Sequence, residues 1–513
     1  MNLEGLKIQD TESLSSKNRT RILIFALIFM VINTLIIILL LQDNEFINEY
    51  DKYLWNTKII LILNGVCFGC FSITLKFVNK LNIKKLFLIF LLTRIVWLYF
   101  LIIFNYGVEI DFHLAPIFMP KIFNGELFTP YHSNWLEDAW RIVPPMLLWW
   151  YAYNYWIYGL DVIIWRHVYL LLEIGIVYLM IQIFHENSGT EKGWSEEKFK
   201  IGLLFYTFSF IALVAIILYT NIIGFPVLIS MLGFLFFFRS KRNPKYIYHA
   251  IFFFCIATLT EFFAAIWILG ILLILIFQKK FKRFFILIGE IFVIFCVVCL
   301  PFLINDALGF LERFVWVYKS YSGSRDSTIW AINYYIYNLP ESINYIPAIL
   351  AILLTIYIVY KNYNNTEISL NFFITIICIF EFFTPTFNPL HYLWIFPLIC
   401  VYILYSLRKF FITNLFFMGF FLFFIIWGLI AYVSYPGPFF PNYTATYTEI
   451  VEHYMPTAGY YVVYCLVGHL IFQMGFIYLI FSYTKSKKLV LLLLVPFTIY
   501  YTFNICVPSN LFA

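Results

Sequence analysis

The sequence predicts an all-α protein, a bundle of transmembrane helices, and three observations support this fold class. Of the 513 residues, 63% are hydrophobic and 12% are charged, whereas soluble domains are roughly 45–50% apolar. The mean hydropathy is +0.85. Apolar runs of the roughly 17–25 residues needed to cross a bilayer recur from one end of the sequence to the other. A soluble core cannot bury so much apolar surface, so we expect a polytopic membrane protein.

The apolar runs differ in length and strength. The clearest lie at residues 22–41, 85–106, 161–184, 284–304, 411–432 and 460–483. Weaker or shorter runs lie at 57–77, 143–158, 200–219, 222–238, 246–259, 262–277, 345–360, 371–384, 389–406 and 489–506. Together they predict about 13–15 spans.

Lysine and arginine indicate the side of each connecting segment, because basic residues in short loops stay on the cytoplasmic side. The residues expected there are Lys17, Arg19, Arg21, Lys80, Lys84, Lys85, Arg239, Lys241, Arg242, Lys245, Lys279, Lys280, Lys282, Arg283, Arg408, Lys409, Lys485, Lys487 and Lys488. The segments 42–56, 107–141, 305–344 and 433–459 are then expected on the outer side. The run 143–158 breaks the alternation if it crosses, so we expect a re-entrant or half-buried helix there and leave a crossing open.

This sidedness divides the chain into six parts without a separate soluble domain. They are a cytoplasmic N-terminal tail at 1–21, transmembrane helices at 22–106, an outer loop with interfacial helices at 107–160, transmembrane helices at 161–304, an outer loop at 305–344 and C-terminal transmembrane helices at 345–513. The net charge of +6 comes mostly from the inner loops. It therefore indicates orientation and contact with anionic lipid, and no nucleic-acid motif accompanies it.

The most informative segment is 108–145, in the first long outer loop. Asp111 follows an apolar run directly and is expected about one turn beyond the membrane. Apolar residues at helical spacing then predict an amphipathic helix over 112–123, lying in the plane of the interface. An Asn-Gly pair at 124–125 would end this helix. A Pro-Pro pair at 144–145 would open the next apolar run, because proline is tolerated in the first turn of a helix.

This segment resembles the first outer loop of polyprenyl-phosphate-sugar-dependent glycosyltransferases with the multi-spanning C-type (GT-C) fold, mannosyltransferase-like branch. The shared features are the Asp after a membrane helix, the interfacial helix ending in Gly, a Pro-Tyr pair at 130–131 and the Pro-Pro pair. The stretch TPTFNPLHYLWIFPL at 384–398 is similar to the family's late pattern of Pro, Tyr, an aromatic residue and Pro. The chain departs from the pattern at Val143, where the family has an aromatic residue, and at His113, near the family's usual Tyr.

The resemblance implies a catalytic Asp111 and a set of substrate-binding residues. In the family, the Asp takes the proton of the acceptor hydroxyl while the lipid phosphate leaves. Cations would bind the phosphate, and arginine suits it because its planar fork presents paired donors. The substrate-binding residues expected are His113, Arg141, Glu261, Arg313, Lys319, Arg325, His391 and Tyr392. The alternatives are a helix-ending carboxylate at the interface for Asp111 and solvated loop charges for the charged members of this set.

Four acidic residues lie within apolar segments. We expect one outward-opening cavity lined by Asp111, His391 and basic residues of the outer segments. Glu261 interrupts the long run 246–277 where it should turn at the outer surface, so its side chain could reach this cavity; a hairpin-turn carboxylate is the alternative. We expect Glu173, Glu290 and Glu381 to face the protein interior and to have partners, because an unpaired charge in a membrane is costly.

These observations favour an integral membrane glycosyltransferase. It would move a sugar, with mannose suggested by the resemblance, from a polyprenyl-phosphate donor to a glycan, lipid or protein acceptor. We expect it in the cell membrane as a multi-pass protein with its active site on the extracytoplasmic face, in contact with membrane lipid and without a nucleic-acid partner. No cofactor is required by the sequence, and a divalent cation stays open. The alternatives are a flippase or transporter for a lipid-linked sugar, and a polysaccharide polymerase or ligase.

Overall fold

The computed structural model describes fourteen stretches of the chain, and all of its described elements are helices. The stretches are 66–67, 69–103, 145–159, 162–188, 194–209, 212, 223–323, 345–363, 369–383, 389–403, 409–410, 412–414, 474–475 and 477–482. Side chains at 101, 162, 262, 306, 309, 311–323, 345–348, 381–383 and 389–391 are outside the description. No strand occurs in these stretches, which agrees with the predicted all-α class.

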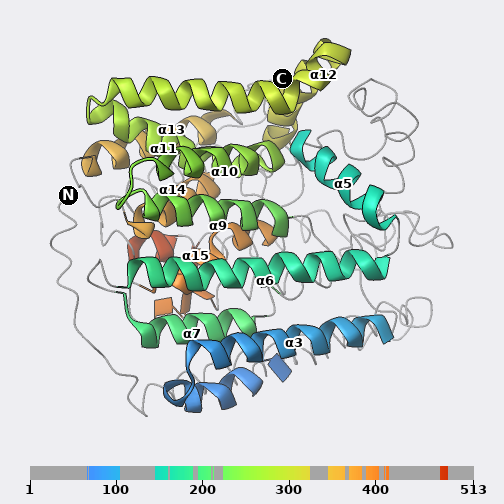
Figure 1. Ribbon diagram of the computed structural model, residues 1–513. Coiled ribbons are helices and arrows are strands. Elements are labelled where there is room, and N and C mark those ends of the chain that lie inside the picture. The colour runs from blue at the N-terminus through green and yellow to red at the C-terminus, as the bar shows by residue number, and fades with distance from the viewer. Residues whose placement is uncertain are drawn as a thin grey trace, which may run out of the picture.

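The described helices range in length from three to 43 residues. In chain order they are η2 (Val78–Lys80), α3 (Ile83–Ile103), α5 (Pro145–Tyr158), α6 (Val162–Asn187), α7 (Glu196–Thr207), α9 (Gly224–Arg239), α10 (Tyr246–Thr260), η5 (Phe262–Ala264), α11 (Ala265–Phe277), α12 (Phe281–Gly323), α13 (Tyr345–Asn362), α14 (Leu370–Phe383), η8 (Pro389–Trp394) and α15 (Phe396–Val401). Figure 1 shows α12, α10, α9, α6, α7 and α3 stacked with their long axes in similar directions.

The basic connections gather at one end of this bundle, on the left in Figure 1. Contacts across that end join segments that are distant in sequence. Glu186, at the end of α6, forms ion pairs with Arg239 at 3.6 Å and Arg242 at 3.1 Å, after α9. Gln278, after α11, donates a hydrogen bond of 2.8 Å to the carbonyl oxygen of Tyr363, after α13. The turns α6–α7, α9–α10 and α11–α12 therefore share one end of the molecule.

Two of the described helices can cross a membrane by length and composition. They are Ile163–Asn187 and Phe281–Asn305, each 25 residues long. Shorter apolar helices lie at Gly224–Arg239, Tyr246–Thr260, Ala265–Phe277, Ile349–Asn362 and Leu370–Phe380. In Figure 1, α9 and α10 end well before the right-hand end of α6, because α6 is the longer helix.

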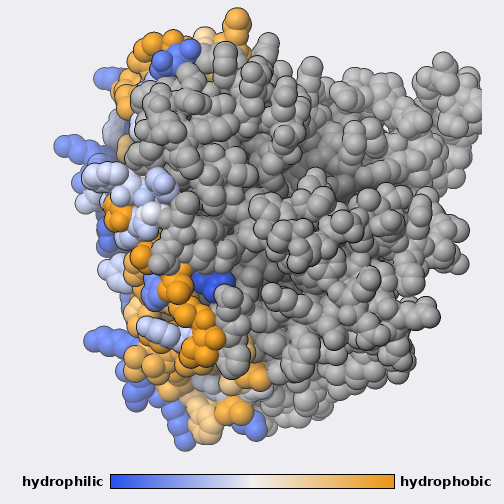
Figure 2. Space-filling view, turned by 90° about the vertical axis from the view of Figure 1, so that its right-hand side faces the viewer, coloured by the Kyte–Doolittle hydropathy of each residue, from blue (hydrophilic) through white to orange (hydrophobic). Residues whose placement is uncertain are grey.

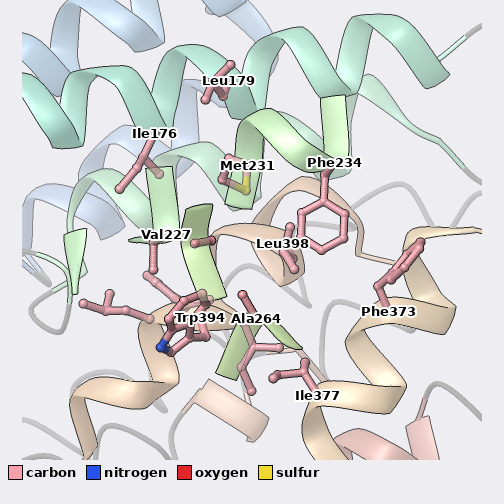
Figure 3. Packing of buried hydrophobic residues seen from close by; sticks show 14 of the residues in the cluster. Ile176, Leu179, Val227, Met231, Phe234, Ala264, Phe373, Ile377, Trp394 and Leu398 are labelled. Atoms are coloured by element: carbon pink, nitrogen blue, oxygen red, sulfur yellow. The ribbon is translucent and has the colours of Figure 1, made fainter. Parts of the chain in front are cut away.

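Aromatic side chains fill the centre of the bundle. The Phe234 ring of α9 lies 4.8 Å from Trp267 of α11 and 5.2 Å from Phe373 of α14, measured between ring centroids. Figure 3 shows Phe234 and Phe373 with Trp394 of η8 and Ile176 of α6 in the same cluster. Close packing of such rings joins helices that are far apart in sequence in one core.

Several element boundaries can be compared with the sequence analysis. Helix α5 begins at Pro145, as the Pro-Pro pair predicts, and a turn at Glu261 divides the run 246–277 as expected. The apolar run 200–219 behaves differently, since α7 ends at Thr207. Helix α12 also continues through Pro301 to Gly323, so the first half of the expected loop 305–344 is helical.

Candidate functional site

The expected catalytic loop begins and ends at the side of the bundle away from the basic connections. Helix α3 runs from the left of Figure 1 and ends at Ile103 on the right, where α5 also lies. Trp150 of α5 stacks on Phe225, at the start of α9, with ring centroids 4.1 Å apart. Tyr151 packs 5.9 Å from Trp165, at the start of α6. Both described flanks of the segment 104–144 are therefore held near the ends of α6 and α9 that are opposite the basic turns.

Several expected site residues fall outside the described part of the chain. Asp111, His113, Arg141 and Arg325 lie in undescribed segments, as does the predicted interfacial helix 112–123. Arg313 and Lys319 belong to the last part of α12, beyond Pro301, and His391 belongs to η8, but their side chains are not described. Of the expected residues, Glu261 and Tyr392 remain with described side chains.

Glu261 lies in the turn between α10 and α11. Its backbone N–H donates a hydrogen bond of 2.8 Å to the carbonyl oxygen of Ala257, which ends α10. The hydroxyl of Thr260 donates to the carbonyl oxygen of Ile256 at 2.8 Å. The Glu261 side chain is half-buried. Because α10 starts at the basic turn after α9, its other end carries Glu261 towards the opposite end of the bundle.

The Glu261 turn and the family-like stretch 384–398 are adjacent. The ring of Phe263, two residues after Glu261, lies 6.2 Å from Trp394, and Trp267 lies 5.7 Å from the same indole. In Figure 3, Trp394 and Ala264 of the turn lie side by side. Two regions that the sequence analysis assigns to one cavity are therefore in contact, although they are more than a hundred residues apart in sequence.

Tyr392 is buried within this contact region. Its hydroxyl donates a hydrogen bond of 2.8 Å to Oδ1 of Asn414, and Nδ2 of Asn414 donates to the carbonyl oxygen of Phe410 at 2.8 Å. The tyrosine hydroxyl thus joins η8 to a later segment. In this conformation it fixes the position of η8, the element that also carries His391.

A buried ion pair, which the sequence analysis did not identify as a pair, joins α3 to α6. Nη2 of Arg94 lies 2.7 Å from Oε1 of Glu173, Nε donates to the same oxygen at 2.8 Å, and both side chains are 0% exposed. Arg94 also donates to the carbonyl oxygens of Thr207 at 2.6 Å and Tyr206 at 3.3 Å. These are the last residues of α7, where helix carbonyls carry partial negative charge. Arg94 therefore caps α7 inside the bundle.

The sequence predicts a partner in the protein interior for both Glu173 and Glu290. This is confirmed for Glu173, whereas Glu290 behaves differently. Oε2 of Glu290, on α12, is buried without a hydrogen-bond partner in the described part of the chain. The side chain of Glu381 is not described. A signal for the Arg94–Glu173 pair was present in the sequence, because each is the single charge near the middle of an apolar run. Opposite charges near the middle of two apolar runs predict a pair.

Metal ligands do not cluster in the described part. Among the residues with described side chains, no group of three or more His, Cys, Asp and Glu residues is arranged to hold a metal ion. The fold defined by these stretches is an all-helical bundle in which two helices can cross a membrane. No family model matches the chain, and neither a curated protein nor a solved structure matches it.

Proposed function

We propose that the chain is a multi-spanning membrane glycosyltransferase that takes a sugar from a polyprenyl-phosphate donor at the extracytoplasmic face of the cell membrane. The acceptor is a glycan, a lipid or a protein. The observation that carries the proposal is the position of the segment 104–144, whose described flanks lie opposite the basic end of the bundle. Basic connections face the cytoplasm, so a segment anchored at the other end faces outward.

The chemistry of this reaction requires a base at the depth of the lipid phosphate. Asp111 would accept the proton of the acceptor hydroxyl while that oxygen forms a bond to the anomeric carbon of the sugar. The bond between this carbon and the phosphate oxygen breaks, and the lipid phosphate leaves with the electron pair. Cations near the phosphate would stabilise the charge of the leaving group. Arg141, Arg313, Lys319, Arg325 and His391 are the proposed source of that charge.

Among the described residues, the contact between the Glu261 turn and η8 supports the proposal. The two elements contact each other through Phe263 and Trp394, and a lipid-linked sugar would meet the outer segments beside this contact. Glu261 would bind hydroxyl groups of the sugar, since a carboxylate accepts hydrogen bonds from them. Tyr392, with its hydroxyl already bonded to Asn414, would position η8 and His391.

One observation favours a second candidate, a transporter or flippase of a lipid-linked sugar. Helix α7 begins at the basic end and has 12 residues, a length of about 18 Å, whereas the hydrocarbon core is about 30 Å thick. Figure 1 shows that α7 reaches only about halfway along α6. Helices that end inside a bundle beside a buried charge are typical of transporters. Transport without sugar transfer by the reconstituted protein would select this candidate.

The test of the transferase is a set of three single substitutions assayed with radiolabelled polyprenyl-phosphate sugars. Asp111→Asn keeps the size of the side chain but cannot accept the proton, so sugar transfer should fall about 10²–10⁴-fold while the donor still binds. Glu137→Gln and Asp138→Asn are the matched controls, because both carboxylates belong to the same loop. If one of these controls is inactive and Asp111→Asn is active, the base is misassigned. If all three transfer sugar normally, the proposed function is wrong.

A further inference from the structure

Helix α12 has a long apolar surface that no described element covers. Phe285 and Phe292 are each 66% exposed, Val297 is 69% exposed and Ile304 is 73% exposed. On the opposite side of the helix, Leu287 is buried against the bundle. Only 22% of the most apolar window of α12 is buried, compared with 61% for that of α6. Figure 2 shows hydrophobic side chains along the top edge, at the height that α12 occupies in Figure 1.

Four basic residues lie at the N-terminal end of this apolar surface. Lys279, Lys280 and Lys282 are exposed and Arg283 is half-buried, around the turn from α11 to α12. Among the described residues none of the four has an ion-pair partner. In the α9–α10 turn at the same end, by contrast, two basic residues have an acidic partner, because Glu186 pairs with Arg239 and Arg242. The α11–α12 turn therefore carries uncompensated positive charge.

The backbone of this turn keeps the lysines in a fixed place. Lys279 has a φ of 56°, in the left-handed region where glycine is usual. The N–H of Lys280 donates to the carbonyl oxygen of Leu275, and that of Lys279 to Ile276, each at 2.9 Å. This is the Schellman arrangement that closes a helix.

The length of the surface matches one membrane. From Arg283 to Ile304 the helix rises about 32 Å, close to the roughly 30 Å of a hydrocarbon core. Glu290, half-buried, is the single charge between Arg283 and Asn305. Charge at one end and an apolar stripe along the rest is the pattern that a phospholipid complements, with its phosphate at the lysines and its acyl chains on the stripe.

We propose that α12 is a lipid-facing helix and that Lys280, Lys282 and Arg283 form a binding site for the phosphate of an anionic phospholipid. This site rests on the membrane location in the proposed function, but not on the transferase reaction. The uncompensated charge of the α11–α12 turn selects anionic over zwitterionic lipid. The exposed stripe above it holds the acyl chains.

The experiment compares two lysine pairs at the same end of the molecule. The full chain in detergent is titrated with phosphatidylglycerol or with phosphatidylcholine of the same acyl chains, and bound lipid is counted by native mass spectrometry. For K280Q/K282Q the affinity for phosphatidylglycerol should fall by about tenfold or more, since each basic residue near an anionic head group contributes substantially. K241Q/K245Q, with the same change in net charge, should lose clearly less, because Phe252 is the one large exposed apolar side chain among the described residues of α9 and α10, so acyl chains have no stripe to follow there. Binding of phosphatidylcholine should be equal in all three proteins.

Three outcomes would overturn the proposal. Equal losses in the two variants would mean that the end of the molecule attracts anionic lipid without a site. No loss in either variant would remove the lysines from lipid binding. A dimer of the wild-type chain that K280Q/K282Q converts to a monomer would show that a second copy covers α12. Alkaline carbonate separates these failures from that of the proposed function: release of the wild-type chain from membranes would refute the membrane location itself.

Discussion

At the scale of single residues, the Arg94–Glu173 pair has the largest expected effect on stability. Removing one partner of a fully buried pair leaves an uncompensated charge, which costs about 3–5 kcal/mol. Glu173→Gln, which leaves the Arg94 charge in the bundle, should therefore lower the free energy of unfolding by about 3 kcal/mol or more. Thermal unfolding of the detergent-solubilised protein would show this as a lower Tm.

The matched control for this prediction is another carboxylate in an ion pair. Glu196 pairs with Lys200 at 2.8 Å one turn later on α7, but its side chain is 60% exposed. Exposed pairs of this kind contribute little, so Glu196→Gln should change the stability by less than about 0.5 kcal/mol. Equal effects of the two substitutions would contradict the structural role given to burial.

A second residue-scale prediction concerns the left-handed Lys279. A side chain in this conformation costs about 1–2 kcal/mol that glycine does not incur. Lys279→Gly should therefore raise the free energy of unfolding by up to about 1 kcal/mol, whereas Lys279→Ala, which removes the same charge, should not raise it. Equal stabilisation by both would mean that the charge, and not the backbone, is the source of the cost.

At the scale of elements, Gly202 allows α7 to approach α15. A Cβ atom at Gly202 would overlap the carbonyl oxygen and backbone of Cys400. Gly202→Ala should therefore force the two helices apart and destabilise the protein by about 1–3 kcal/mol. Gly289→Ala on α12 is the control, because nothing lies within 4 Å of a Cβ there; it should be neutral or stabilise by up to about 1 kcal/mol. Chemical denaturation of both variants measures the difference.

Some element boundaries could be predicted from sequence, and others depended on tertiary contacts. The start of α5 at Pro145 and the turn at Glu261 follow from local chemistry, because proline suits a first helical turn and a charge interrupts an apolar run. The end of α7 had no such signal: the residues after Thr207 are still apolar. Its end depends on the guanidinium of Arg94, which is more than a hundred residues away in sequence.

In the candidate site, too, some features could be predicted from sequence and others depended on tertiary contacts. The Glu261 turn contacts the stretch 384–398 through Phe263 and Trp394, and the cavity that the sequence predicts stays a prediction. The bond from Tyr392 to Asn414 could not be predicted, because no pattern connects the two positions. The continuation of α12 past Pro301 was also missed, since an interior proline usually ends or kinks a helix. Asp111 and its loop lie outside the described residues, and its role stays a prediction.

At the scale of the whole molecule, the gathering of the basic turns at one end is the feature that connects fold and function. Positive charge in short connections sets the orientation of a membrane protein. In the proposed function it turns the basic connections α9–α10 and α11–α12, and with them the α6–α7 turn at the same end, towards the cytoplasm. The described flanks of the segment 104–144 lie at the other end, so the proposed function assigns this segment and its reaction to the opposite compartment.

This sidedness is tested most directly by labelling single introduced cysteines in intact cells with a membrane-impermeant thiol reagent. Ser133→Cys lies in the loop of Asp111, and Asn243→Cys lies in the α9–α10 turn; the unsubstituted chain gives the background from its native cysteines. We expect Ser133→Cys to be labelled in intact cells and Asn243→Cys only after the membrane is permeabilised. Labelling of both positions in intact cells, or of neither, would place them on the same side and contradict the proposed multi-spanning transferase.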